Sequence, residues 1–169
     1  LYQNDPLFAK QQVPNQAIQT ELVRIQREDD AFITSLPTDS FVRWFLPIRK
    51  LVSSVGAVAQ YRTAELPQTI TAFRTLAYAD SRLAKSGLFR DVFESQFWLL
   101  ENSGGTLEEN YEKMEVSLDA ILKSLEKDEL RYNEVVGYLI ELLERRSLMQ
   151  AAEYLALKVL EQERVAIQP

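Results

Sequence analysis

The stretch TLEENYEKMEVSLDAILKSL, residues Thr106–Leu125, decides the fold class. Its apolar residues recur every three or four positions, which is the spacing of one face of an α-helix. They are Leu107, Tyr111, Met114, Leu118, Ile121, Leu122 and Leu125. Gly104 and Gly105 precede it, and Thr106 with Glu109 forms the S/T-x-x-E pattern of a helix start. The stretch therefore predicts an amphipathic helix that begins at Thr106.

Two more helices are predicted downstream. Asp128 is a good N-cap, and Ser147 with Gln150 indicates the start of the last helix. Their apolar stripes are Tyr132, Val135, Val136, Leu139 and Leu143, and then Leu148, Ala152, Leu155, Val159 and Leu160. Gly137 lies inside the first of these helices, where glycine costs about 1 kcal/mol relative to alanine. We therefore expect another helix to cross closely at Gly137.

Prolines and polar caps divide the N-terminal part into further predicted helices. Asp5-Pro6 indicates one start, Pro14 an interruption, and Asn15 a second start for a helix that closes at Pro37. The apolar residues of that helix are Ile18, Leu22, Ile25 and Phe32.

Three more starts complete the pattern. Thr38 or Asp39 is expected to cap a segment that Pro47 kinks or restarts, Pro67 opens another helix, and Ser86 caps one more. With no pattern of period two, the sequence predicts an all-α fold, a single-domain antiparallel helical bundle or array of about seven helices over residues 1–169. A solenoid-like stack of the last four helices is the alternative.

Composition excludes several classes of function. The 169 residues include no cysteine and no histidine, which removes thiol nucleophiles, disulfides, Cys/His zinc sites and histidine-based triads. We expect no catalytic residue, no cofactor and no metal, so the chain is predicted not to be an enzyme. The net charge of -6 argues against nucleic acid as a partner. The longest charge-free run, residues 51–61, is too short to span a membrane.

The negative charge is concentrated in the C-terminal part. Residues 101–169 carry 8 Lys and Arg against 15 Asp and Glu, whereas residues 1–100 carry 11 against 10. This imbalance predicts an acidic face, which a solvated helix pair also explains. Exposed glutamate pairs such as Glu108/Glu112 and Glu141/Glu144 are interpreted as solvated rather than metal-binding, because no histidine completes a helix-bundle carboxylate site.

Aromatic residues supply the candidates for a contact surface. Phe89, Phe93, Phe97 and Trp98 lie within ten residues and either fill the core or line a pocket. Trp98 lies off the apolar stripe of its helix, so we expect it at a boundary or contact surface. Trp44 lies in the segment FVRWFLPIRK, which mixes aromatic and basic residues. Such a segment is either a core helix with solvated cations or an element that lies on a membrane surface or lines a ligand groove.

Four segments resemble one family. Pro37–Phe41 (PTDSF), Phe73–Leu76 (FRTL), Ala79–Leu88 (ADSRLAKSGL) and Ala151–Ala156 (AAEYLA) occur in the order found in exported bacterial thiol-disulfide oxidoreductases of the TlpA/ResA type. They resemble the helical region ahead of the thioredoxin-fold module, and the order holds along residues 30–160. The resemblance implies a periplasmic or cell-envelope location, with the redox work done by a C-x-x-C in the following module.

What the resemblance implies for this chain is an accessory role. Without cysteine the chain cannot itself exchange disulfides, so it would space, orient or dock the thioredoxin-fold module, or bind its client. We expect Arg82 to pair with Asp80 structurally or to recognise a partner. We also expect the frame to continue past Pro169 into a C-x-x-C pattern, with an export signal upstream. A free-standing helical adaptor or a ligand-binding bundle is the alternative function.

Overall fold

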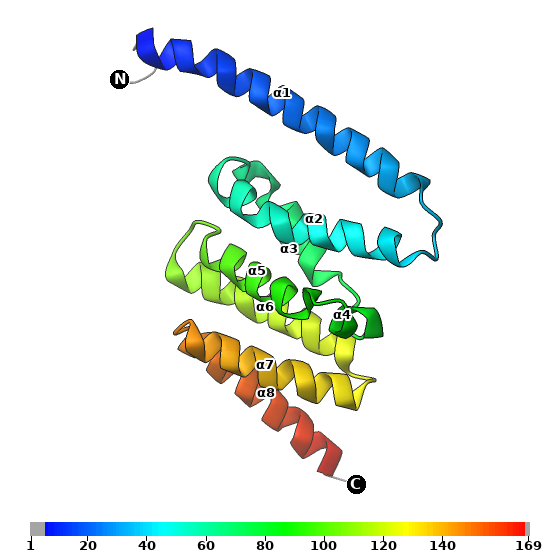
Figure 1. The fold of residues 1–169 in the computed structure, drawn as a ribbon. Helices are drawn as coiled ribbons and strands as arrows, with labels where there is room; N and C mark the ends of the chain where they lie inside the picture. The colour runs from blue at the N-terminus through cyan, green and yellow to red at the C-terminus, as the bar shows by residue number, and fades with distance from the viewer. Residues whose placement is uncertain (1–5, 168–169) are drawn as a thin grey trace. The chain divides into compact units, whose positions relative to one another are not determined.

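The computed structural model describes the backbone of residues 6–167 and the side chains of residues 16–162. Within that part of the chain the fold is all-α with no strand, as predicted, and it has eight α-helices and one 3-10 turn where about seven helices were expected. The helices are α1 (Pro6–Ser35), α2 (Phe41–Gln60), α3 (Leu66–Arg74), α4 (Ser81–Lys85), α5 (Leu88–Glu101), α6 (Leu107–Leu125), α7 (Glu129–Arg145) and α8 (Met149–Ile167). Figure 1 shows their order along the chain.

The chain divides into two compact units, residues 1–47 and 48–169, and the boundary falls inside α2. The single-domain organisation stays a prediction. The predicted cap at Asp5 lies outside the described residues. The predicted interruption at Pro14 and start at Asn15 are wrong, because α1 runs through both positions. A proline removes one backbone hydrogen bond, and the turns on either side keep theirs.

The start of α2 also differs from the prediction. Ser40, rather than Thr38 or Asp39, caps the helix, with its Oγ accepting a hydrogen bond of 3.1 Å from the backbone N–H of Arg43. The backbone N–H of Ser40 donates to the carbonyl of Pro37 at 3.1 Å, so a turn occupies residues 37–40 before the helix begins. No new helix starts at Pro47, which lies inside the continuous α2.

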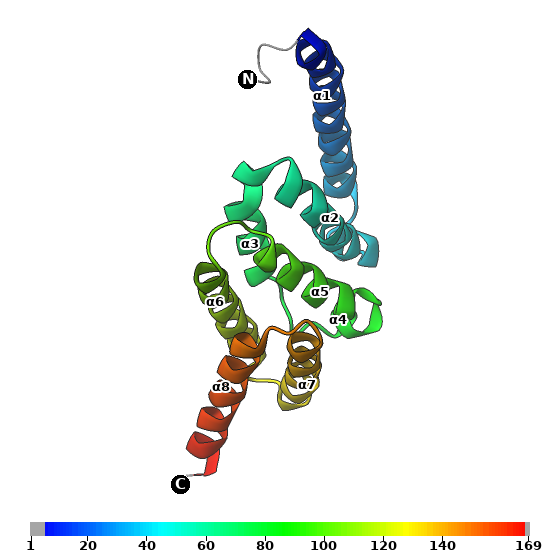
Figure 2. The same cartoon turned by 90° about the vertical axis from the view of Figure 1, so that its left-hand side faces the viewer.

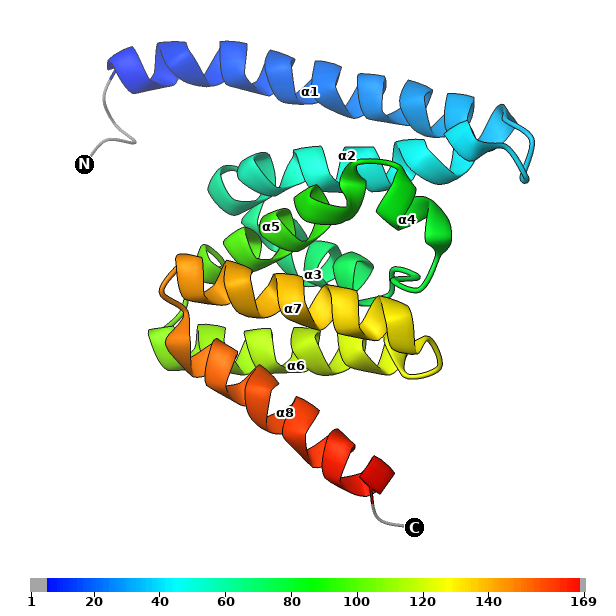
Figure 3. The same ribbon diagram turned by 60° about the horizontal axis from the view of Figure 1, so that its bottom comes forward.

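The second unit packs each helix mainly against its neighbours along the chain. α7 contacts α8 and α6, α6 also contacts α8 and α5, and α3 contacts α5 and α6. Figure 3 shows α6 and α7 side by side, and Figure 2 shows the short α4 beside the start of α5. The fully buried side chains of this unit include Phe73, Tyr78, Phe93, Phe97, Leu118, Ile121, Leu125, Leu139 and Leu155. Most of the predicted stripe of α6 is therefore in the core.

The predicted caps of α6 and α7 are confirmed. Thr106 accepts a hydrogen bond from the backbone N–H of Glu109 at 3.1 Å, and Asp128 accepts one from that of Arg131 at 3.0 Å. Leu107 is an exception to the stripe, because it is the first residue of α6 and is 68% exposed. Pro67 lies in the first turn of α3, as predicted.

The predicted cap at Ser147 is wrong. Ser147 has a φ of 60° and follows α7, whose last turn it closes: its N–H donates to the carbonyl of Glu144, and the N–H of Leu148 donates to that of Leu143. This is a helix C-terminal motif in which the left-handed position usually holds glycine. The α8 helix then begins at Met149.

A buried polar network connects α3, α5 and α6. The hydroxyl of Tyr78 donates to the carbonyl of Phe73 at 2.6 Å and accepts from Nε2 of Gln96 at 2.7 Å. Arg74 donates from Nε to Oγ of Ser117 and from Nη2 to the carbonyl of Lys113, both at 2.9 Å. These bonds fix α3 against α6 and so support α5, on which the candidate site is built.

Candidate functional site

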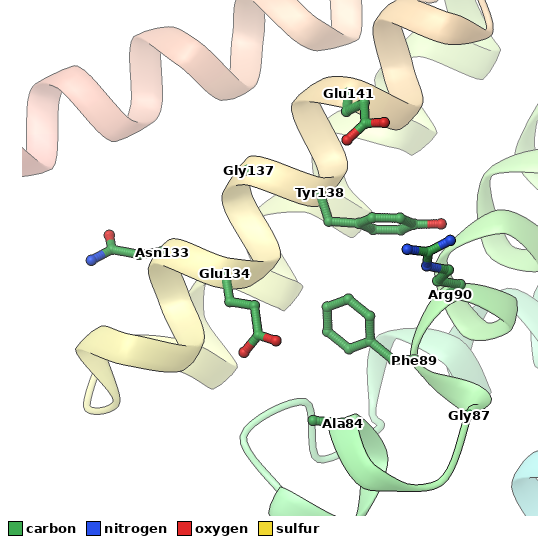
Figure 4. Close-up of a pocket in the computed structure, with 9 residues that line it drawn as sticks. All are labelled: Ala84, Gly87, Phe89, Arg90, Asn133, Glu134, Gly137, Tyr138 and Glu141. Carbon is green, nitrogen blue, oxygen red and sulfur yellow. The ribbon is translucent and has the colours of Figure 1, made fainter.

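An open groove lies between the α4–α5 corner and α7 (Figure 4). Its volume is about 610 Å³. Its lining residues are Ala84, Gly87, Phe89, Arg90, Asn133, Glu134, Gly137, Tyr138 and Glu141. The groove lies entirely within the second unit, and it combines two aromatic rings with three charged side chains. Ligand sites in proteins likewise combine aromatic surface with a few polar groups.

Gly137 leaves the α7 wall of the groove bare. A Cβ atom built on Gly137 would have no heavy atom within 4 Å, so the predicted close helix crossing at this position is wrong. The reason is that α7 packs on α6 and α8 through its opposite side, where Val135, Leu139 and Leu142 are buried. The glycine therefore faces open space and widens the groove.

Gly87 shapes the opposite wall. It precedes α5 with a φ of 77°, a conformation that glycine adopts without strain. The predicted cap at Ser86 is wrong, because Gly87 holds the N-cap position of α5 and has no side chain to cap it. Ser86 lies one residue further out and accepts a hydrogen bond of 3.3 Å from the backbone N–H of Leu88, the first residue of the helix. The sharp turn places Phe89, one residue into α5, in the groove.

Phe89 and Tyr138 form the aromatic wall. Their ring centroids are 5.4 Å apart, and both rings contact Phe93 beneath them, at 5.2 Å and 6.0 Å. Phe93 is fully buried, whereas Phe89 and Tyr138 are half-buried. α5 and α7 therefore meet through aromatic rings, and one surface of the Phe89–Tyr138 pair stays open to the groove.

The Tyr138 hydroxyl is held by charged neighbours. It donates to Oε1 of Glu94 at 3.1 Å, and the same oxygen accepts from Nη2 of Arg145 at 3.0 Å. Partial burial, and then the Glu94 carboxylate, raise the pKa of Tyr138. The guanidinium carbon of Arg90 lies 6.0 Å from the centre of the Tyr138 ring, within reach of a cation–π interaction. Tyr138 is therefore fixed in place.

Two glutamates of α7 border the aromatic wall. Glu134 forms an ion pair with Arg131 at 3.1 Å, and more than half of the Glu134 side chain is exposed. Glu141 forms no ion pair with any side chain in the described part of the chain and is exposed. In Figure 4 the Glu134 carboxylate points toward Phe89, whereas Asn133 points outward.

Asp80 and Arg82, predicted from the sequence, lie together as expected. Asp80 caps α4 by accepting from the backbone N–H of Arg82 at 2.9 Å, and its carboxylate pairs with Nη2 of Arg82 at 2.7 Å. The hydrogen bond from the Arg82 side chain lowers the pKa of Asp80. The structural interpretation of this pair is supported, and neither residue lines the groove.

The two tryptophans are not part of this site. Trp98 lies on α5 and is half-buried, in agreement with a boundary position. Trp44 lies on α2 in the first unit, where its ring centre is 5.4 Å from that of Phe41. Of the predicted aromatic cluster, only Phe89 lines the groove.

Composition limits the kinds of side chain that this site can offer. The sequence has no cysteine or histidine, and the described residues hold no group of three or more acidic side chains placed to bind a metal ion. None of the described helices combines the length and apolar character needed to cross a bilayer. Comparison with family models, curated proteins and solved structures finds no match.

Sequence reasoning did not single out Arg90, Glu134 or Tyr138, and it treated Glu141 only as a solvated surface residue. The signal was present at Gly137, because a helix-interior glycine beside an aromatic residue marks either a close packing contact or a gap. Only the position of α5 relative to α7 decides between the two, and that depends on contacts such as Phe89 with Tyr138.

Proposed function

We propose that this chain is a non-catalytic helical interaction domain attached to a thioredoxin-fold oxidoreductase of the bacterial envelope. In this proposal the groove between α5 and α7 receives a segment of the oxidoreductase module or of its client. The redox chemistry belongs to the partner, because this chain has no thiolate to attack a disulfide.

One observation carries the proposal. The segment ADSRLAKSGL, residues 79–88, which contributes most to the family resemblance, forms α4 and supplies Ala84 and Gly87 of the groove. The Asp80 cap and its pair with Arg82 hold the start of α4, and Gly87 turns the chain into α5. Residues of the segment that resembles the family therefore also shape the groove.

The other resembling segments support a rigid body. Arg74 of the FRTL segment ties α3 to α6 through Ser117 and Lys113. Ala151 and Ala152 of the AAEYLA segment are buried, which allows α8 to pack closely against its neighbours. A rigid body that presents one open groove suits a domain that orients a partner.

The test is site-specific photo-crosslinking in the complete gene product, expressed in its native host. A benzophenone amino acid replaces Asn133 at the rim of the groove, and a control replaces Val116, an exposed residue of α6 outside it. We expect Asn133, but not Val116, to crosslink to a thioredoxin-fold module of the same polypeptide or to a disulfide-containing client. A gene product without a C-x-x-C module, or equal crosslinking from both positions, would overturn the proposal.

The free-standing adaptor is the second candidate, because an open groove also suits a peptide from an unrelated protein. In the same experiment it predicts crosslinks from Asn133 to a protein with no thioredoxin fold and no disulfide, from a gene product that has no C-x-x-C module.

A further inference from the structure

We propose that the groove recognises a cationic side chain, lysine or arginine, on the docking segment of its protein partner. This inference rests on the proposed function, since it names the chemistry of the segment that the groove receives. It is argued from three features of the groove: its aromatic wall, the two glutamates of α7, and the position of Arg90.

The aromatic wall fits the stem and head of a long cationic side chain. Phe89 and Tyr138 stand 5.4 Å apart, and both are half-buried, so their accessible surfaces face the groove. The methylene groups of lysine or arginine pack on such apolar surfaces while the charged end of the side chain stays in contact with water or polar groups. The face of a tyrosine ring also attracts a cation within about 6 Å.

The glutamates lie on either side of that wall. Glu134 and Glu141 are separated by seven positions, with Tyr138 between them at four and three positions, so all three share one face of α7. Two helical turns place the glutamate backbones about 10.5 Å apart along the axis. A cation over the Tyr138 ring therefore has a carboxylate toward each end of the groove.

Arg90 shows that the ring already attracts a cation. Its guanidinium lies 6.0 Å from the Tyr138 ring centre, and the residue is exposed, so it can move aside when a partner enters. Of the two carboxylates that line the groove, Glu134 already pairs with Arg131, whereas Glu141 forms no ion pair within the described part of the chain. The Glu141 carboxylate favours an incoming cation and disfavours an acidic segment.

The experiment uses the full 169-residue chain and three capped pentapeptides of alanine with arginine, citrulline or glutamate at the centre. Citrulline keeps the shape of arginine without its charge. Binding is followed by the amide chemical shifts of Gly137 and Tyr138. We expect saturable shifts with the arginine peptide only. Equal shifts with the citrulline peptide, or none with arginine, would overturn the inference.

Variants assign the charge recognition to single residues. Glu141→Gln should weaken binding of the arginine peptide about two- to fivefold, the range expected for one exposed charge pair. Arg90→Ala should strengthen binding, because it removes the competing cation. Glu112→Gln, an exposed glutamate of α6 outside the groove, is the matched control. Weaker binding by Arg90→Ala, or an equal effect of Glu112→Gln, would overturn the assignment.

The two proposals fail in different ways. If Asn133 crosslinks to a thioredoxin-fold module and the arginine peptide does not bind, the interaction domain stands and the cationic specificity is wrong. If the peptide binds and the gene product has no such module, the specificity stands and the oxidoreductase partner is wrong.

Discussion

The hydroxyl of Tyr78 offers a direct test of the buried network. Tyr78 is 0% exposed and stacks on Phe93 with ring centres 5.3 Å apart. Replacing it with phenylalanine keeps the ring and removes only the hydroxyl, which joins Phe73 to Gln96. The Tyr78→Phe variant therefore isolates the energy of the polar network from that of packing.

The expected cost is set mainly by Gln96. This residue is 1% exposed, its Oε1 is buried without a hydrogen-bond partner, and its Nε2 would lose its bond to Tyr78. A buried polar group left without a partner costs about 1 to 3 kcal/mol. Losing the Tyr78 hydroxyl costs the Phe73 carbonyl less, because this carbonyl also accepts a hydrogen bond of 3.4 Å from the backbone N–H of Leu76. We expect Tyr78→Phe to lower the free energy of unfolding by about 2 kcal/mol.

Urea unfolding followed by circular dichroism measures this free energy. The matched control is Tyr154→Phe, which removes a hydroxyl bound to the exposed Asp119 at 2.8 Å and should cost less than about 0.5 kcal/mol. In the double variant Tyr78→Phe/Gln96→Leu, part of the loss should be recovered, because no polar group is then orphaned. Equal effects of the two tyrosine variants would refute the reasoning.

Three further predictions concern stability. Leu122→Ala should cost about 2 to 5 kcal/mol and Glu112→Ala less than about 0.5, because the first is buried and the second exposed; urea midpoints of the two should differ accordingly. Ser147→Gly should add about 0.5 to 1 kcal/mol in the same assay by relieving the left-handed conformation, and a loss would contradict this. Partial burial, and then Asp119, raise the pKa of Tyr154 to about 12, above the unfolded value of about 10. The protonated Tyr154 therefore contributes fully to the stability of the fold below a pH of about 10, and this contribution is lost as the pH rises to about 12. Tyr154→Phe should make the urea midpoint fall less over this range, and an unchanged fall would be contrary evidence.

The helices could be predicted where the signal is local. Thr106 and Asp128 cap their helices because a side-chain oxygen needs to reach only three residues along the chain. The apolar face of α6 was predicted because the spacing of its residues alone defines one side of a helix. Leu107 is exposed although it belongs to that spacing, because the first turn of α6 extends past the core. Asp80 with Arg82 was also local, two residues apart.

The groove could not be predicted because its parts are distant in sequence. Phe89 and Tyr138 come from helices whose relative position depends on the whole core. The same holds for the hydrogen bond between Tyr78 and Gln96, because these residues are 18 positions apart and no helical spacing relates them. At Ser147 the sequence misled, because serine is common at helix starts and here occupies a position after a helix end.

The packing order of the second unit bears on how the protein acquires its fold. α4 contacts α5, α5 contacts α6, α6 contacts α7, and α8 returns to α7 and α6, so most contacts close short loops of chain. Proteins with such local contacts fold quickly, because little chain entropy is lost before each contact forms. During synthesis each new helix of this unit therefore emerges beside a partner already made, and the exposed apolar surface waiting for later residues stays small.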